Sequence, residues 1–368
     1  MEILFNTSQL VSVIKNIAPT SEAKQTLAIL GNMSVNILNN SATFVASDLE
    51  IEIESSVECA SDTDGSFTVP AKKFLEICNA LSSHEEIKVI VTNNKADVIA
   101  GKSKVSLPTL SFDDFPRMSY EGSEENNKIP LDEFNNIINK TSFAMAYQDA
   151  RHFLNGLHLC SESGKLIAVC TDGHRLAKYE SDVDYNGNLS IIVPRKAILE
   201  INRILASFSD NTENLAEFTV TNNNIQVKIN GYTITSKLIE GNYPNFNKVI
   251  PTETNAKITV NKTIFKNSLN IISKVVNQQY KGVKLTPSSN ALHLITSNTE
   301  SEVGEDEIEA SYDGDEMSIG FNISYIQDVI DTLESESVEI CINDQNSGCI
   351  LVGPSDNKSI FVIMPMRV

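Results

Sequence analysis

Apolar and polar positions alternate along the chain in a way that predicts short helices and many short strands. After Pro70, apolar residues recur at helical spacing, in Phe74, Ile77, Cys78 and Leu81. Spacing of this kind predicts one buried helix face. We expect the proline at the first helical position, where its missing N–H costs nothing. Residues 225–229 and 232–235 instead alternate strictly, which predicts half-buried strands around a tight turn.

The same pattern occurs three times. The helical segment at 69–81 returns 124 residues later, at 193–205, and a weaker copy lies at 321–333, where Asn322 or Ser324 could cap the helix. The strand end at 45–48 matches 169–172 at the same offset, and 294–298 resembles both. Helix-like segments near 9–17, 131–140 and 262–274 open the three units. We therefore interpret the chain as a tandem triplication.

Each unit then consists of a strand, a helix, several strands, a second helix and more strands. This order predicts the α+β class, with three tandem domains that each hold antiparallel sheets and two helices. We expect domain boundaries at 1–126, 127–254 and 255–368. The polar run at 121–127 and the Pro/Thr/Asn-containing segment at 251–255 suit linkers between them.

Composition bounds the cellular setting. The 368 residues include 29 Lys+Arg against 48 Asp+Glu, for a net charge of -19. No stretch approaches the roughly 20 apolar residues of a membrane span, and the first residues do not resemble a signal peptide, so we expect a cytoplasmic protein without a membrane partner. The six cysteines form no C-x-x-C pair, which predicts reduced and mostly buried thiols. The bulk acidity alone argues against conventional nucleic-acid binding.

Catalytic chemistry has one candidate, the string Asp172-Gly173-His174-Arg175. An acid and a histidine two residues apart could act in a hydrolase, but no nucleophile elbow accompanies them, and a turn with an exposed histidine explains them as well. Residues 48–54 alternate acidic and apolar side chains, which predicts an edge or half-exposed strand. The acidic run at 300–309 lacks calcium-loop spacing and predicts a solvated loop. We expect no catalytic residues, no metal site and no cofactor.

The basic residues and the C-terminus carry more information. Lysines and arginines recur at the starts of equivalent helices, at Lys72, Lys73, Arg195 and Lys196. Such residues are usually solvated, but their recurrence also allows a shared basic face inside an acidic shell. The last nine residues are apolar almost to the end, and the methionines there suit either a core or a pocket for varied peptides.

Taken together and in order, several motifs resemble those of the bacterial DNA polymerase III β subunit family, the β sliding clamps, over essentially the whole chain. The motifs are Leu27-Ala28-Ile29-Leu30-Gly31-Asn32, Val69-Pro70-Ala71-Lys72-Lys73-Phe74, Ala146-Tyr147-Gln148-Asp149-Ala150-Arg151, Leu154-Asn155-Gly156, Thr171-Asp172-Gly173-His174-Arg175-Leu176, Val193-Pro194-Arg195-Lys196, Gly320-Phe321-Asn322-Ile323-Ser324-Tyr325 and Met364-Pro365-Met366-Arg367.

The resemblance implies a ring-shaped homodimer that encircles duplex DNA, with helices lining the hole. It implies a processivity factor that tethers the replicative polymerase, is loaded by an ATP-dependent clamp loader and serves other replication and repair proteins. Retention would be topological, so weak contacts to phosphates would suffice. The resemblance assigns the DNA-facing role to Lys24, Lys72, Gln148, Arg151, His152, Phe153, Arg195 and Lys196.

Two further sites follow from the resemblance. The cleft that receives partner linear motifs would comprise Leu154, Thr171, Gly173, His174, Arg175, Leu176, Pro244, Val249, Asn322, Tyr325, Val362, Met364, Pro365, Met366 and Arg367. The dimer interface would comprise Lys73, Lys102, Lys104, Val105, Val275, Glu300 and Glu302. Two hypotheses from other classes stay open at this point: a hydrolase that uses Asp172 and His174, and a scaffold that binds peptides but never DNA.

Overall fold

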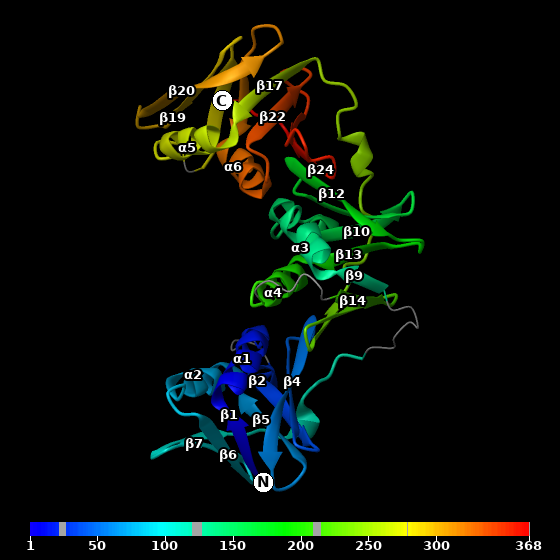
Figure 1. The fold of residues 1–368 in the computed structure, drawn as a ribbon, viewed down its shortest axis with the longest axis vertical. Coiled ribbons are helices and arrows are strands. Elements are labelled where there is room, and N and C mark those ends of the chain that lie inside the picture. Colours follow the sequence, from blue (N-terminus) through cyan, green and yellow to red (C-terminus); the bar gives the residue numbers. More distant parts are fainter. Residues whose placement is uncertain (22–26, 120–126, 209–214, 278, 368) are drawn as a thin grey trace. The chain divides into compact units, whose positions relative to one another are not determined.

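A computed structural model describes residues 1–21, 27–119, 127–208, 215–277 and 279–367, and Figure 1 shows its elements. The fold divides into two compact units. The first unit comprises residues 1–134 and 196–238, and the second comprises residues 135–195 and 239–368. Each unit contains one antiparallel sheet of twelve strands.

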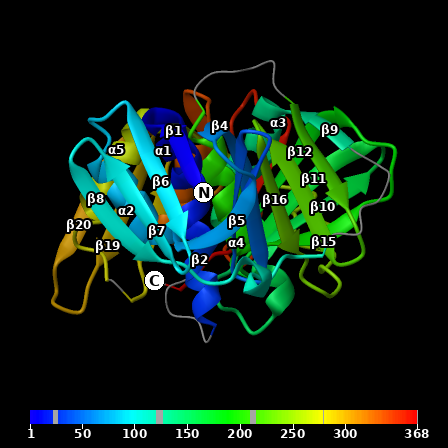
Figure 2. The ribbon, with the colours of Figure 1, turned by 90° about the horizontal axis from the view of Figure 1, so that it is seen from below.

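The first unit contains the first repeat and part of the second. Its strands are β1 (Glu2–Asn6), β2 (Asn32–Leu38), β3 (Ser41–Ser47), β4 (Ile51–Ser61), β5 (Gly65–Pro70), β6 (Glu86–Thr92), β7 (Lys95–Ala100), β8 (Ser103–Pro108), β9 (Asn127–Pro130), β14 (Leu215–Val220), β15 (Asn224–Ile229) and β16 (Tyr232–Lys237). Helices α1 (Thr7–Ile17) and α2 (Ala71–Ala80) pack against each other. Strand β8 ends the order β8-β7-β6-β1-β4-β16-β15-β14-β9, and Figure 2 shows β6, β7 and β8 side by side.

The second unit contains the rest of the second repeat and the third. Its strands are β10 (Gly156–Glu162), β11 (Lys165–Thr171), β12 (Arg175–Asp184), β13 (Ser190–Pro194), β17 (Ala256–Asn261), β18 (Gly282–Pro287), β19 (Ala291–Ser297), β20 (Val303–Tyr312), β21 (Ile319–Asn322), β22 (Ser337–Ile342), β23 (Cys349–Val352) and β24 (Ser359–Ile363). Helices α5 (Lys262–Ile272) and α6 (Ile323–Thr332) pack together. Helices α3 (Leu131–Asn139) and α4 (Arg195–Leu205) each begin close to a boundary between the units.

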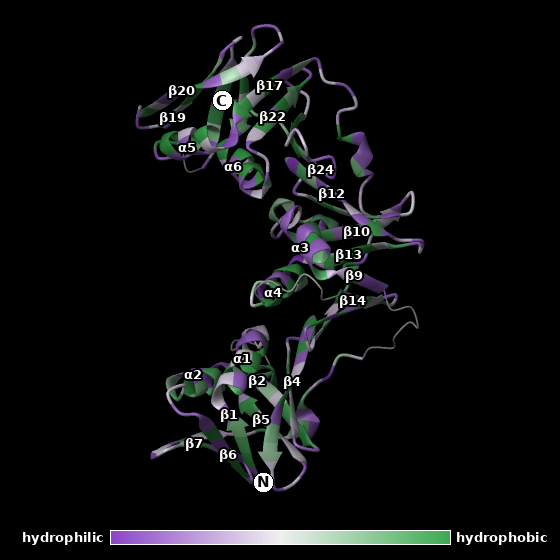
Figure 3. Cartoon of the chain, viewed as in Figure 1, coloured by the Kyte–Doolittle hydropathy of each residue, from purple (hydrophilic) through white to green (hydrophobic). Residues whose placement is uncertain are grey.

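All six predicted helices are present, each with an apolar and a polar face (Figure 3). On α2 the predicted residues Phe74 and Cys78 are fully buried. Asn322 caps α6, because its side chain accepts a hydrogen bond from the N–H of Ser324. The predicted position of the proline is wrong by one residue. Pro70 is the N-cap, with extended backbone, and the helix begins at Ala71.

Each sheet continues from one repeat into the next through a single pair of strands. In the first unit β4 pairs with β16 over five residue pairs, from Ile51↔Ser236 to Ser55↔Tyr232. In the second unit β12 pairs with β24 over five residue pairs, from Arg175↔Ile363 to Tyr179↔Ser359. We call these two strand pairs the β4–β16 seam and the β12–β24 seam. Backbone hydrogen bonds therefore join consecutive repeats.

Two predictions about acidic segments are wrong. Residues 51–54 lie in β4, which pairs with β1, β3 and β16 and is therefore a central strand. Glu52 is buried there because the Arg117 guanidinium pairs with it at 3.0 Å. The acidic run after Glu302 is strand β20 and not a loop. Glu305, Glu307 and Glu309 point outward, while Ile308 faces the core and Asp306, on the same face as Ile308, is partly buried.

The predicted state of the cysteines is confirmed. All six are free thiols, and four of them are buried. Burial raises the pKa of the Cys170 thiol to about 12, so this thiol is protonated at neutral pH. No helix among the described residues is long and apolar enough to cross a bilayer.

Candidate partner-binding cleft

A predominantly apolar cavity of the second unit begins at the turn between β11 and β12. Asp172 accepts hydrogen bonds from the backbone N–H groups of His174 (2.9 Å) and Arg175 (3.0 Å), and Thr171 Oγ1 accepts one from Gly173 (3.1 Å). Gly173 has φ +88°, a conformation that glycine adopts without strain. The sequence Thr-Asp-Gly-His-Arg therefore folds into a turn whose backbone donors are satisfied by its own side chains.

This turn borders a cleft of about 320 Å³. Apolar side chains dominate its lining, which is typical of small-ligand and peptide sites. The lining residues are Arg151, Phe153, Leu154, Thr171, Gly173, His174, Arg175, Leu176, Pro244, Asn245, Phe246, Val249, Val362 and Met364.

The floor of the cleft belongs to the hydrophobic core. Leu176, Phe246 and Val362 pack in one buried cluster with Cys160, Ile167 and Val169. The C-terminal segment forms one wall, since the N–H of Met364 donates to His174 O (2.9 Å) and that of Met366 donates to Gly320 O (2.8 Å). The strand residues Val362 and Ile363 are thus buried, and Met364 is a wall of the cleft, which favours the pocket alternative for this methionine.

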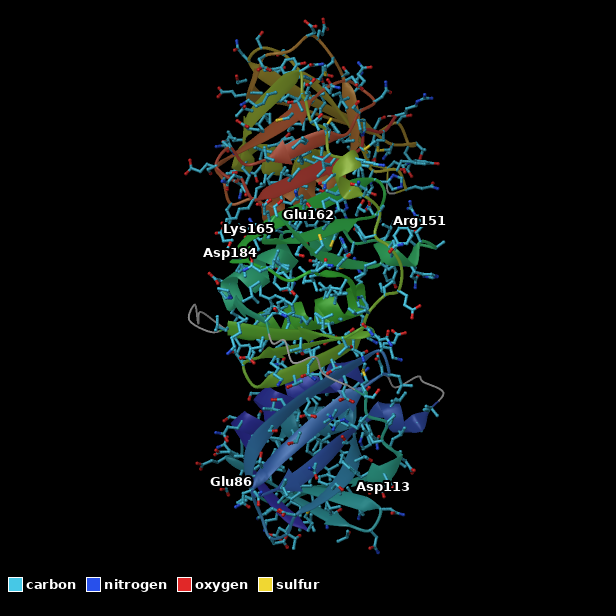
Figure 4. All side chains as sticks on the ribbon, turned by 90° about the vertical axis from the view of Figure 1, so that its right-hand side faces the viewer. Glu86, Asp113, Arg151, Glu162, Lys165 and Asp184 are labelled. Carbon is cyan, nitrogen blue, oxygen red and sulfur yellow. The ribbon has the colours of Figure 1, made fainter. Side chains whose placement is uncertain are left out.

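Arg151 lies over the turn at one side of the cleft. A Cβ atom on Gly173 would approach Arg151 Nη2 to 2.9 Å, so a larger residue there would displace the guanidinium in addition to straining the backbone. The carboxylate of Asp149 holds Arg151 through Nε (3.0 Å) and Nη2 (2.9 Å). This pairing lowers the pKa of Asp149 to about 2. In Figure 4 Arg151 projects at the surface of the second unit, well away from the Lys165–Asp184 pair of the β11–β12 hairpin.

Arg175 is almost completely enclosed. Its side chain is 11% exposed and pairs with Asp172 through Nε (3.1 Å) and with Asp328 through Nη1. Nη2 donates to Phe143 O (2.6 Å). The guanidinium also lies over the rings of Phe143 (5.3 Å) and Tyr325 (4.4 Å). Arg175 therefore joins the turn to helix α6.

A stacked pair of rings lies close behind the cleft. His158 and Tyr243 are parallel, with centroids 4.4 Å apart, and Phe246 meets His158 edge-on at 6.3 Å. His158 Nδ1 lies 3.2 Å from Ile191 O. Burial lowers the pKa of His158 and raises that of Tyr243, so both rings are uncharged at neutral pH.

The structure brings most of the predicted cleft residues together and leaves five out of the lining. Tyr325 lies against Arg175, Asn322 caps α6, and Pro365, Met366 and Arg367 continue beyond Met364. Sequence reasoning missed Asn245 and Phe246. They directly follow Pro244, with Asn245 as the N-cap of the short 3₁₀ turn Phe246–Lys248, and their proximity to that proline was the available signal.

The residues predicted to face DNA are differently situated. Lys24 lies outside the described residues. Lys72, Gln148 and His152 are exposed, whereas Arg151 and Phe153 line the cleft. Arg195 donates to Met145 O (3.0 Å) and lies 5.9 Å from the ring of the exposed Tyr147. Lys196 forms an ion pair with Asp48.

The residues predicted at a dimer interface lie on the two units. Lys102, Lys104 and Val105 are exposed at or next to β8, and Lys73 is exposed on α2, where it pairs with Glu76 at 3.0 Å. Glu300 and Glu302 are exposed before β20. Val275 is half-buried and lies against Gly304. A Cβ atom added to Gly304 would approach Val275 Cγ2 to 2.6 Å.

The geometry does not favour acid–base chemistry at Asp172 and His174. One carboxylate oxygen of Asp172 accepts two backbone N–H groups and the other pairs with Arg175, so the carboxylate is committed to the turn. Among the described residues, no group of three or more His, Cys, Asp or Glu side chains is arranged to hold a metal ion.

Family models of the DNA polymerase III beta subunit match nearly the whole chain. The N-terminal domain matches residues 1–119, the central domain 128–245 and the C-terminal domain 247–367. This chain belongs to the DNA polymerase III beta subunit family. A family member from Haemophilus influenzae, a beta sliding clamp, is 33% identical over the full length of both chains.

Solved structures of the family agree with the fold. The DNA polymerase III subunit beta of Pseudomonas aeruginosa has a TM-score of 0.93 at 31% identity, and the sliding clamp of Bartonella birtlesii, bound to griselimycin, has 0.95 at 27%. Both comparisons cover all of both chains. The function of the chain is accordingly that of the family, a sliding clamp and processivity factor in DNA replication.

Proposed function

We propose that two copies of the chain close into a cytoplasmic ring that encircles duplex DNA, slides along it and tethers the replicative polymerase. An ATP-dependent clamp loader places the ring on DNA, and other replication and repair proteins dock on it through short linear motifs. Each copy contributes three domains, at 1–126, 127–254 and 255–368.

The observation that carries the dimer is a pair of equivalent strand edges. Strands β8, β16 and β24 close the same part of each repeat, and β4, β12 and β20 are equivalent to one another. Two of the three possible junctions form within the chain, β4 with β16 and β12 with β24. In the described part of the chain, β8 ends its sheet, and residues 303–309 of β20 pair only with β19. A second copy can complete the third junction, since open edges recruit strands.

The register of the two seams extends to this junction. Thr233 is opposite Glu54 in the β4–β16 seam. By the equivalence of the hairpins and turns, Lys104 corresponds to Thr233 and Glu305 to Glu54. Lys104 would therefore lie opposite Glu305 of the second copy, with Val105 opposite Gly304 and close to Val275. Opposite charges at facing positions stabilise a strand pair. In the single chain, Lys104 pairs with Asp97 (2.8 Å) and Glu305 with His293 (2.7 Å).

DNA passage is supported by basic residues within an acidic chain. Lys72 and Arg195 stand at the starts of equivalent helices, while the net charge is -19. Gln148, Arg151, His152, Lys24, Phe153 and Lys196 complete the proposed set. A ring that is retained topologically needs only weak, salt-labile phosphate contacts.

The cleft supports docking of linear motifs. It is apolar, it has polar anchors at Thr171, His174 and Arg175, and Met364 is a deformable wall. An extended peptide with two or three apolar side chains fits such a groove. We propose that Asn322, Tyr325 and the segment 365–367 support the groove from behind.

The deciding experiment measures retention on DNA. The chain is loaded by a bacterial clamp loader with ATP onto nicked circular DNA, and half of the sample is then linearised. Loss from the linear DNA with retention on the circle is the expected result. Equal retention on both forms would mean ordinary affinity and would refute the ring.

The dimer has its own test in Glu305→Lys. Because this change faces Lys104 with a like charge, we expect dimerisation to weaken about tenfold in analytical ultracentrifugation. Glu309→Lys on the same strand is the matched control, since the register takes residue 309 past the turn between β7 and β8, whereas residue 307 would face Lys102. Combining Glu305→Lys with Lys104→Glu should restore the dimer, and no change in either variant would refute this register.

A further inference from the structure

We propose that Asp328 is a positioning residue for the cleft, although it is not among the residues that line it. Asp328 lies on α6 and reaches the cleft only through the Arg175 guanidinium, with which it forms an ion pair. The inference rests on the proposed use of the cleft for partner binding. It adds that helix α6 sets the shape of the groove.

Arg175 links the turn between β11 and β12 to helix α6. Its backbone N–H belongs to the turn that Asp172 caps, and the neighbouring His174 O holds the tail through Met364 N–H. Its guanidinium contacts Asp172, Asp328 and Phe143 O. A movement of the guanidinium is therefore transmitted directly to both walls of the groove.

Asp328 faces a different hollow. Together with Phe143, Asn139 and Thr332, it borders a space of about 550 Å³ between α3 and α6. The Asp328 side chain is 42% exposed, whereas that of Arg175 is 11% exposed. Asp328 is thus accessible from the helix side while its partner is enclosed, so a change at Asp328 can alter the cleft without occupying it.

The two carboxylates hold the guanidinium from different elements. Without Asp328, Asp172 is the remaining carboxylate partner of Arg175 in the described contacts, and its Oδ2 already accepts from Nε at 3.1 Å. The guanidinium would then move toward Asp172, whose Oδ1 caps the N–H groups of His174 and Arg175. Because a buried charge demands compensation, this shift reorients the turn. The cleft consequently depends on a residue 153 positions away from Arg175 in the sequence.

The test compares two aspartates on the same helix. Asp331 lies three residues after Asp328 and pairs with Lys266 at 2.6 Å instead of with Arg175. Asp328→Asn and Asp331→Asn change the net charge equally. Griselimycin serves as the probe, and its affinity for each full-length variant is measured by isothermal titration calorimetry. Chemical-shift changes of cleft residues on binding, or a loss of binding in Met364→Ala, identify the cleft as the site.

We expect Asp328→Asn to weaken griselimycin binding roughly fivefold or more, and Asp331→Asn to change it less than twofold. Asp328→Glu should recover most of the affinity. In an Arg175→Lys background the Asp328→Asn effect should shrink, since the two residues act through one contact. Thermal unfolding of each variant establishes that the fold is retained.

Equal affinities of the two asparagine variants for griselimycin, with normal binding by the unchanged chain, would overturn the inference alone. Failure of the unchanged chain to bind griselimycin in the cleft would overturn the proposed use of the cleft and the inference with it. A loss of affinity in Asp328→Asn that follows only its loss of thermal stability would assign Asp328 a structural role and also overturn the inference.

Discussion

The turns that precede β4 and β12 have the same backbone construction and different uses. In the first, Asp48 accepts N–H hydrogen bonds from Glu50 and Ile51, both at 2.8 Å, and Ser47 Oγ accepts one from Leu49 at 3.2 Å. In the second, Asp172 and Thr171 do the same for His174, Arg175 and Gly173. Repetition has therefore kept the hydrogen bonds of the turn while its side chains changed.

The two turns differ at the residue with positive φ and at the cation. Leu49 has φ +77° where Gly173 has +88°. The Asp48 carboxylate pairs with Lys196, whereas Asp172 pairs with Arg175 of its own turn. A turn repeated in the chain can therefore form part of a seam alone or also one edge of a cleft, depending on whether a side chain occupies its exposed corner.

Exchanging the corner residues should give the largest effect. Gly173→Leu places the side chain of the first turn into the second, where it meets Arg151 and enters the cleft. We expect griselimycin binding to fall more than about a hundredfold, with a loss of about 1–2 kcal/mol of unfolding free energy. Calorimetric binding and urea denaturation measure both. The reverse exchange, Leu49→Gly, should leave binding unchanged, and an equal loss in both variants would break the comparison.

Removing the capping carboxylates should have the next largest effect. Asp48→Ala and Asp172→Ala each remove the acceptor of two turn N–H groups and one carboxylate partner of a cation, so each should cost about 2 kcal/mol of unfolding free energy. Only Asp172→Ala should also weaken griselimycin binding. If Asp48→Ala weakened binding as much, the cleft would depend on global stability and not on its own turn.

Contacts at helix ends in the two units allow a test with a smaller expected effect. In the first unit Arg203 of α4 donates to Asn16 O at 2.6 Å, near the end of α1. In the second unit Lys140, which follows α3, donates to Thr332 O at 2.8 Å, at the end of α6. A cation at a helix C-terminus stabilises it. Arg203→Met and Lys140→Met should each cost about 1 kcal/mol, measured by urea denaturation. A much larger cost for one variant would show that the two helix-end contacts are not energetically equivalent.

The smallest expected effect is a dependence on pH that distinguishes the units. Burial holds the pKa of His158 below its usual value, so the folded chain binds fewer protons there than the unfolded chain. The contribution of the neutral His158 ring to the free energy of unfolding is complete above the unfolded-state pKa of about 6.5 and is lost as the pH falls below that value. Ser34 occupies the equivalent position in the first unit, 124 residues earlier. Denaturation at pH 7.5 and 5.5 should show a lower free energy of unfolding at pH 5.5. The His158→Gln variant should show a smaller difference between the two pH values.

The sequence predicted the elements well because their signals are local. Helix periodicity, the Asx turns and the threefold repetition all lie within short windows, and the family motifs gave most of the cleft lining. The position of β4 as a central strand could not be predicted, because Glu52 is compensated by Arg117, 65 residues away. The placement of Arg151 over Gly173 and the pairing of Arg175 with Asp328 likewise depend on tertiary contacts that no local pattern encodes.

The β4–β16 and β12–β24 seams also differ from the proposed β8–β20 junction in how they respond to concentration. Both seams join strands of one polypeptide, so connecting chain fixes the effective concentration of their partners however dilute the protein is. A junction between two copies follows mass action. On dilution, therefore, the repeats within one chain stay joined, and in the proposed ring the β8–β20 junction is the one that opens.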